Sequence, residues 1–241
     1  MQEQLEKMIS EAGNRNLFWA SFIDSQNLEV MAEVGVYRGH FAEDILKRCS
    51  TIQKYIMIDP WRNLEDWNKP ANETDGAFEK IYREAMNRTE MAKEKRKVLR
   101  GKTTEVIDQI EDESLDFAYI DGDHTLKGIT IDLLNVWPKI KDGGFVGGDD
   151  FGANIWQHSR KYEPTMVFPY AVYFAEAVGA KIYGLPFNQF LMIKGNTGFE
   201  FVDLIDGRYR ETGLRTQFTE SPLDFIKRKL KKRNPQSSRE L

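Results

Sequence analysis

The sequence predicts an α/β fold: a doubly wound, mostly parallel sheet of seven strands that closes with a C-terminal antiparallel hairpin. Short apolar runs alternate with helical patterns, as in a parallel sheet covered by helices on both faces. The last two strands have no helix between them, so they must run antiparallel. Polar residues follow the apolar runs, and such sheets bind ligands at the carboxyl ends of their strands.

The apolar runs and periodic segments give the expected elements in order. Strands are predicted over 29–34, 55–59, 97–101, 116–121 and 143–150, and the closing pair within 181–194. Helices are predicted over 2–12, 15–26, 39–49, 77–95, 103–110, 127–137 and 168–179. Residues 1–195 are expected to form one domain, with 1–28 as an N-terminal helical extension. Residues 196–241 are expected to form a C-terminal extension with a basic tail.

Composition excludes several classes of protein. Hydrophobic residues make up 41% of the 241 and the net charge is −4, which suits a folded core and disfavours nucleic acid as a partner. The basic tail, 226–241, is interpreted as a solvated end that could also touch an acidic surface or RNA. No apolar run is long enough to span a bilayer. A single cysteine, Cys49, and the lack of an apolar signal core predict a cytoplasmic protein. The two extensions are plausible surfaces for a homo-oligomer.

Three strand ends describe a pocket for a nucleoside. Gly35 and Gly39 in "EVGVYRGHF", 33–41, allow a tight strand-to-helix turn whose helix can receive an anion. The spacing is not that of the dinucleotide motif, so a turn without a ligand stays open. Asp59 could accept both ribose hydroxyls or cap a turn before Pro60. Thr103 could bond an adenine edge or cap the helix after it.

The fourth and fifth strand ends carry "IDGDH" and "GGDD". Carboxylates of Asp121, Asp149 and Asp150 on adjacent strands would repel one another unless a cation lies between them. Oxygen ligands suit Mg²⁺, Ca²⁺ or Mn²⁺. His124 could accept a proton near neutral pH, and Asp123 is interpreted as a turn residue.

The order of these motifs over residues 30–195 resembles the class I S-adenosylmethionine-dependent methyltransferases. It is most similar to the metal-dependent O-methyltransferase branch that includes macrolide-sugar and catechol O-methyltransferases. The resemblance implies a Rossmann-like methyltransferase fold and S-adenosylmethionine as cofactor, with Mg²⁺ the expected metal. It implies cofactor-binding roles for Glu33, Gly35, Tyr37, Gly39, Asp59, Thr103 and Asp121. Metal ligands would be Asp121, Asp149 and Asp150, and His124 stands where catechol enzymes carry a lysine base, so His124 and Asp121 are the catalytic candidates.

Two long loops are expected to face the acceptor. The loop 60–76 has the length of a lid, and its Trp61 and Trp67 either cover the pocket or pack on the surface. Trp156 and His158, in the loop 150–164, are candidates for substrate contact. The expected acceptor is a small hydroxylated molecule, such as a sugar or a natural-product intermediate. The alternatives are a metal-dependent phosphoesterase and a cofactor-binding protein without catalysis.

Overall fold

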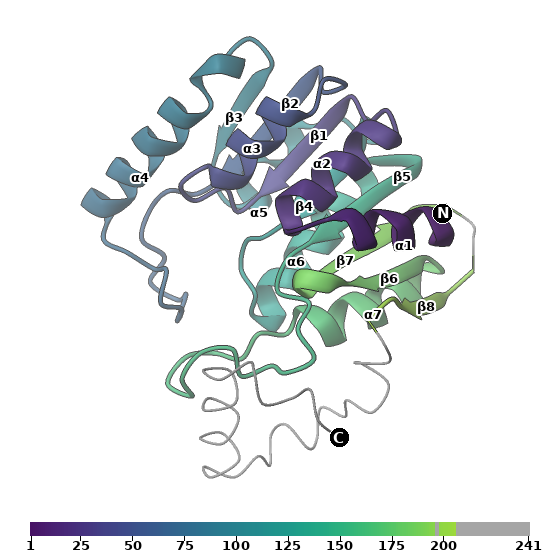
Figure 1. Cartoon of the computed structure of the whole chain (residues 1–241). Coiled ribbons are helices and arrows are strands. Elements are labelled where there is room, and N and C mark those ends of the chain that lie inside the picture. The colour runs from purple at the N-terminus through teal and green to yellow at the C-terminus, as the bar shows by residue number, and fades with distance from the viewer. Residues whose placement is uncertain (196–197, 206–241) are drawn as a thin grey trace.

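A computed structural model describes residues 1–195 and 198–205, and eight strands in this part form one mixed sheet (Figure 1). The strands are β1 Val30–Val34, β2 Lys54–Asp59, β3 Arg96–Arg100, β4 Leu115–Ile120, β5 Ile140–Gly148, β6 Lys181–Leu185, β7 Gln189–Ile193 and β8 Glu200–Asp203. Their order is β3-β2-β1-β4-β5-β7-β6-β8. β1 to β5 pair in parallel, whereas β7 is antiparallel to both β5 and β6. The doubly wound sheet and its antiparallel hairpin are therefore confirmed.

The predicted count of seven strands leaves out β8, which pairs in parallel with β6 at the edge of the sheet. Four residues are too few to show a clear strand period in the sequence. The Phe201 ring of β8 lies 6.2 Å from both Phe151 and Phe168, centre to centre. The start of the C-terminal extension thus belongs to the sheet, whereas the basic tail 226–241 lies outside the described residues.

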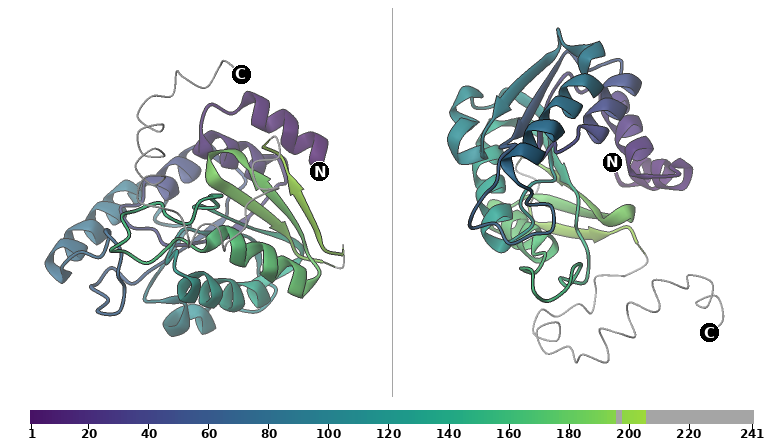
Figure 2. Two further views of the ribbon diagram at one scale, coloured as in Figure 1. Left: turned by 90° about the horizontal axis from the view of Figure 1, so that it is seen from below. Right: turned by 90° about the vertical axis from the view of Figure 1, so that its left-hand side faces the viewer.

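Helices cover both faces of the sheet (Figure 2). They are α1 Gln2–Glu11, α2 Arg15–Ser25, α3 His40–Arg48, α4 Asp75–Arg88, α5 Thr103–Val106, α6 Leu126–Val136 and α7 Val167–Val178. The core residues of α1 to α4 pack on one face and those of α5 to α7 on the other. The prediction of one helix over 77–95 is wrong at its end. The Thr89 hydroxyl donates to the Ala85 carbonyl, 2.8 Å away, and a short 3-10 turn, Glu90–Ala92, leads to β3.

Strand β4 shows how the two layers share the sheet. Phe117 and Tyr119 pack toward α1 to α4, whereas Ala118 and Ile120 pack toward the opposite layer. All four are buried, and burying a ring such as Phe117 stabilises the fold by roughly 2–3 kcal/mol. Because both faces are filled, the parallel strands can offer a ligand only their ends. Nowhere in the described ranges is a helix long and apolar enough to cross a membrane.

The N-terminal extension is part of the core. Trp19 of α2 is fully buried, and its ring centre lies 5.2 Å from that of Phe117 and 5.6 Å from that of Tyr119. Its indole N–H donates to the side-chain oxygen of Gln189 on β7. Helix α2 is therefore held against β4 and β7, close to the strand ends that the sequence singles out.

Candidate active site

A cavity of about 700 Å³ opens at the carboxyl ends of β1 to β4, a volume suited to a nucleoside-sized ligand. Strand ends, α6 and the loop between β2 and α4 line it. Six of the predicted cofactor-binding residues are among them: Glu33, Gly35, Tyr37, Asp59, Thr103 and Asp121. Gly39 is not a lining residue. The structure thus brings most of the predicted cofactor residues to one cavity.

Gly35 joins the turn after β1 to the end of β4. Its φ is +89°, and a Cβ there would lie 2.1 Å from the carbonyl oxygen of Asp121. No side chain fits that space, so glycine allows the turn to lie against the β4 end. Gly39 begins α3 with φ +76°, and its Cβ would lie 3.0 Å from the Cα of Ala85 in α4. The Gly39 position therefore serves helix packing.

Asp59, the last residue of β2, anchors the β1–α3 turn. One carboxylate oxygen accepts the N–H of Tyr37 at 2.8 Å, and the other accepts the N–H of Trp61 at 2.7 Å. Burial raises the pKa of Asp59 to about 6, although these N–H groups oppose the rise. Asp59 thus makes turn contacts, as one of its two interpretations from the sequence predicted. It also lines the cavity.

Glu33 lies one residue before the end of β1 and is buried. Its carboxylate accepts the hydroxyl of Tyr55 at 2.5 Å. Burial raises the pKa of Glu33 to about 8, and the Tyr55 hydroxyl moderates the rise. The methionine end of the expected cofactor would therefore meet a carboxyl group that is close to neutral at neutral pH.

Thr103 does not cap the helix that follows it, so that alternative is wrong: the N-cap of α5 is Lys102. The Thr103 hydroxyl instead donates to Asp132 on α6 at 2.7 Å. Asp132 is buried and lines the cavity, and burial raises its pKa to about 7. The sequence reading missed Asp132, although it is the lone acid in the apolar helix "LKGITIDLLNV".

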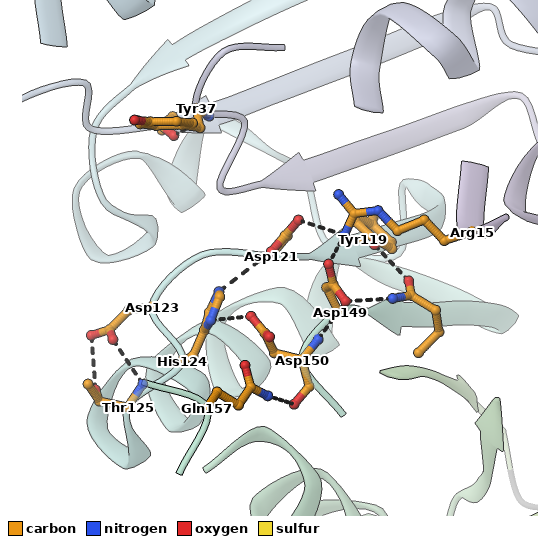
Figure 3. Close-up of polar contacts among 12 residues, drawn as sticks. Arg15, Tyr37, Tyr119, Asp121, Asp123, His124, Thr125, Asp149, Asp150 and Gln157 are labelled. Carbon is orange, nitrogen blue, oxygen red and sulfur yellow. Dashed lines mark hydrogen bonds and ion pairs between the residues drawn. The ribbon is translucent and has the colours of Figure 1, made fainter. Parts of the chain in front are cut away.

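Three side chains meet at the ends of β4 and β5 (Figure 3). Asp121, His124 and Asp150 each offer one ligand atom, and these atoms lie within 4.8 Å of one another. His124 Nδ1 pairs with Asp150, and His124 Nε2 lies 3.5 Å from Asp121. Burial lowers the pKa of His124, but the two carboxylates outweigh it and raise the pKa to about 10. Two carboxylates and an imidazole form a donor set that fits a divalent cation.

Asp149 is not a member of this group. Its carboxylate pairs with Arg15 of α2 and accepts the Gln189 amide at 2.6 Å. Arg15 also lies 3.6 Å from Asp121, and Figure 3 shows it reaching in from the helix side. The structure therefore brings together two of the three predicted metal ligands and adds His124 to them.

Arg15 and Gln189 were both missed at the sequence level. No spacing signals Arg15, because it comes from a helix about a hundred residues before the aspartates that it pairs with. Gln189 is a fully buried polar residue at the start of the apolar strand β7, which is a readable signal. Its side-chain oxygen also accepts the Tyr119 hydroxyl at 2.7 Å, so it links Asp149 to the core.

The turn between Asp121 and α6 is fixed by Asp123. Its carboxylate accepts the N–H of Thr125 at 2.9 Å and the Thr125 hydroxyl at 3.0 Å. Thr125 then caps α6 by accepting the N–H of Gly128. The turn role of Asp123 is confirmed, and it sets the position of His124.

The segment 60–74, called the covering loop from here on, lies over the cavity and bonds to the loop after β5. Trp67 donates to Asp123 at 2.9 Å, and Asn68 donates to the Lys161 carbonyl at 2.9 Å. Trp67 lines the cavity, whereas Trp61 is fully buried in the core. Trp67 is therefore in a position to cover the pocket, as one of the two interpretations predicted, whereas Trp61 is not. In the loop after β5, His158 lines the cavity and Trp156 does not.

Comparisons with known proteins agree with this fold. Residues 32–151 match the family model described as "Methyltransferase domain". A relative from Sinorhizobium fredii (strain NBRC 101917 / NGR234), "Uncharacterized protein y4gI", is 30% identical over 100 residues. That match spans 38% of this chain and only 11% of the relative. Residues 32–151, which run from β1 to just past β5, are therefore similar to a methyltransferase domain.

Solved structures show the same architecture. A "putative caffeoyl-CoA O-methyltransferase" from Staphylococcus aureus has a TM-score of 0.59 at 16% identity, covering 80% of this chain and 91% of its own. An O-methyltransferase from Bacillus cereus in complex with SAH has 0.52 at 16%, covering 79% and 90%. The O-methyltransferase TomG from Streptomyces achromogenes, in complex with SAM, has 0.51 at 10%, covering 80% of each chain. At these identities the likeness establishes the Rossmann-like methyltransferase fold.

Proposed function

We propose that this enzyme transfers the methyl group of S-adenosylmethionine to a hydroxyl group of a small molecule, with the help of a divalent cation. The group formed by Asp121, His124 and Asp150 is the observation that carries this proposal. Asp121 and His124 line the same cavity as the predicted cofactor residues, so a methyl donor and an acceptor could meet there. The similar structures described as O-methyltransferases support the choice of oxygen as acceptor atom.

The cavity residues fit the cofactor. The cavity wall contains three buried carboxyl groups, Glu33, Asp59 and Asp132. They can accept hydrogen bonds from the ammonium and hydroxyl groups of S-adenosylmethionine. Gly35 leaves room for a ligand to approach the backbone beside Asp121. The methyl group is carried on a sulfonium, so the chain's task is to hold the acceptor oxygen in line with it.

A divalent cation held by Asp121, His124 and Asp150 would favour ionisation of the acceptor hydroxyl and fix its position. Mg²⁺ is the expected ion, and the imidazole of His124 makes Mn²⁺ an equally suitable one. With a pKa of about 10 and no ion, His124 is protonated at neutral pH and bridges two carboxylates. In that state it can neither accept a proton nor ligate a cation. As a metal ligand it would first have to lose its proton, and we assign it to that role before that of a base.

The alternative of a metal-dependent phosphoesterase is weaker. Such sites need several histidines, and among His40, His124 and His158 only His124 belongs to the group beside Asp121. The methyltransferase domain match also favours the transferase. A cofactor-binding protein without catalysis would bind S-adenosylmethionine but methylate nothing, so turnover decides between these two.

Calorimetry with S-adenosylhomocysteine and electron paramagnetic resonance with Mn²⁺ test the two parts separately. We expect micromolar to millimolar cofactor binding, and Mn²⁺ binding that weakens at least about tenfold in Asp150→Asn. The matched control is Asp142→Asn, because Asp142 lies near the start of β5, far from the Asp121 group. No cofactor binding at millimolar concentration would overturn the whole proposal. Methylation at full rate after chelator treatment would remove only the metal.

A further inference from the structure

Lys69 of the covering loop is a buried cation without a carboxylate partner. Its exposed fraction is 6%, and it lines the cavity. Its Nζ donates to the carbonyl oxygens of Glu163 at 2.8 Å and Pro164 at 3.4 Å. Within residues 1–195 and 198–205, no carboxylate oxygen lies within 4.0 Å of this nitrogen. Burying a cation without an anion is costly, so the position favours an anionic ligand.

Lys69 lies on the acceptor side of the cavity. Its two carbonyl partners belong to the loop after β5, the strand that is followed by Asp150. Burial lowers the pKa of Lys69, and the charges of Asp123 and Asp150 act against this, which places the ammonium near the ends of β4 and β5. The predicted ribose and adenine residues instead follow β2 and β3, at the other end of the sheet order.

We propose that Lys69 binds a carboxylate of the acceptor, so that the acceptor is a hydroxylated carboxylic acid. This inference rests on the proposed function, because it needs an acceptor hydroxyl beside Asp121 and His124. An ammonium has three N–H bonds, and two are directed to carbonyls, which leaves one for the ligand. A phosphate usually takes several donors or an arginine fork, so a carboxylate is the better match.

The surrounding charges make this contact selective. Asp123, Asp150 and Glu163 lie near Lys69, so an acid bound elsewhere on this wall would meet repulsion. His158 lines the same wall, and its pKa is lowered by burial and by Lys69, so it is a neutral hydrogen-bonding group at neutral pH. Lys69 is then the group that decides where the acceptor's carboxylate lies.

Two pairs of compounds test this on the full chain saturated with S-adenosylhomocysteine and MgCl₂. One pair is 3,4-dihydroxybenzoate and its amide; the other is glucuronate and glucuronamide. Each amide keeps the shape of its acid without the charge. By calorimetry, we expect the acid of at least one pair to bind about tenfold or more tightly than its amide, the size of one charge-assisted hydrogen bond. Lys69→Met should abolish this preference and Lys69→Arg should keep most of it.

Equal binding of acid and amide in both pairs, or no binding of either, overturns the inference. So does a preference that survives in Lys69→Met. Loss of S-adenosylhomocysteine binding in Lys69→Met would assign Lys69 to the cofactor instead and also overturns it. Thermal unfolding of each variant shows whether the covering loop contacts were needed for folding, and Lys69→Arg preserves those contacts. Failure of the parent to bind S-adenosylhomocysteine would sink the proposed function, which is a different result.

Discussion

The proposed site has two halves, one that we propose for the cofactor (the cofactor half) and one for the acceptor and cation (the acceptor half). They hold their carboxyl groups in opposite ways. In the cofactor half, Glu33, Asp59 and Asp132 are buried against a hydroxyl or backbone N–H groups, and burial raises the pKa of each. In the acceptor half, Asp149 pairs with Arg15 and Asp150 pairs with His124. There the His124 charge outweighs burial and lowers the pKa of Asp150. The cofactor half therefore lacks compensating positive charge, whereas the acceptor half already contains it in Arg15 and His124.

This difference indicates what each half is prepared to bind. A cationic cofactor supplies the positive charge that the cofactor half lacks, so its binding relieves an existing cost. In the acceptor half, an incoming cation must compete with the proton on His124 and with the Arg15 guanidinium.

The largest effect is expected at Gly35, where the two halves touch. In Gly35→Ala, the new Cβ would clash with the Asp121 carbonyl, and the left-handed φ adds strain. We expect the free energy of unfolding to fall by roughly 2–6 kcal/mol, with both cofactor and Mn²⁺ binding impaired. Urea denaturation and calorimetry measure these changes.

Gly179→Ala is the control for that variant. Gly179 has φ +67°, but no heavy atom lies within 4 Å of its added Cβ. The free energy of unfolding should fall by only about 1 kcal/mol in this variant, because it adds backbone strain without a steric clash. Equal losses in the two variants would show that Gly35 is not a close contact between the halves.

Removing Arg15 should expose the charge that it balances. In Arg15→Met, Asp149 loses its ion-pair partner and Asp121 loses one of its two neighbouring cations, so we expect about 1–3 kcal/mol less stability without metal, since the pair is only partly buried. Mn²⁺ should bind the variant more tightly than the parent, because one competitor is gone. Tighter binding and lower stability together would sharpen the contrast.

The half-buried pair of Arg38 and Glu84, away from the Asp121 group, supplies the matched control for Arg15. Arg38→Met should change stability by less than about 0.5–1 kcal/mol and leave Mn²⁺ affinity unchanged. If Mn²⁺ binds Arg15→Met more weakly than the parent, Arg15 supports the cation site instead of competing with it.

A smaller effect is expected from Asp59→Asn. The amide nitrogen would face the N–H of Tyr37 or Trp61, so one of these groups loses its acceptor. We expect about tenfold weaker binding of S-adenosylhomocysteine and unchanged Mn²⁺ affinity. Asp66→Asn, on the exposed part of the covering loop, should change neither. A loss of Mn²⁺ affinity as large as the loss of cofactor affinity would mean that the halves are not separate.

The fold could be predicted because most strands are short apolar runs bounded by turn residues, and most helices carry apolar residues at helical spacing. That Gly35, Asp59 and Thr103 line one cavity was predictable for a related reason: each lies at or just after the end of a strand. Parallel pairing then brings those ends together without further information. Strand β8 was not predicted because its four residues at the edge of the sheet show little hydrophobic pattern.

The acceptor half was less predictable, because its partners come from distant elements. Asp149 follows β5 as expected, but its carboxylate pairs with Arg15 of α2 and Gln189 of β7, and it is not one of the clustered ligand atoms of Asp121, His124 and Asp150. Asp150 adopts φ +58°, which aims its carboxylate at His124. Neither the ion pair nor that backbone angle has a signature in local sequence.

The smallest effect is expected at Asp132, in the pH dependence of the free energy of unfolding. It tests whether the carboxyl groups of the cofactor half lack compensating charge. The pKa of Asp132 is raised from 3.8 to about 7 in the folded protein, so between pH 4 and 7 the folded state keeps a proton that the unfolded state releases. The free energy of unfolding must therefore fall as pH rises through this window. An asparagine side chain does not titrate, so in Asp132→Asn the slope should become less steep by up to about 1.4 kcal/mol per pH unit.

Urea denaturation of the parent and the variant from pH 4.5 to 7.5 measures this slope. Thr103→Val is the matched control, because its lost hydroxyl had lowered the pKa of Asp132. That variant should keep the slope and extend it to higher pH. A parent and an Asp132→Asn variant with the same slope would mean that Asp132 is ionised in the folded protein. The cofactor half would then already hold compensated charge, and the contrast between the two halves would fail at its most buried carboxyl group.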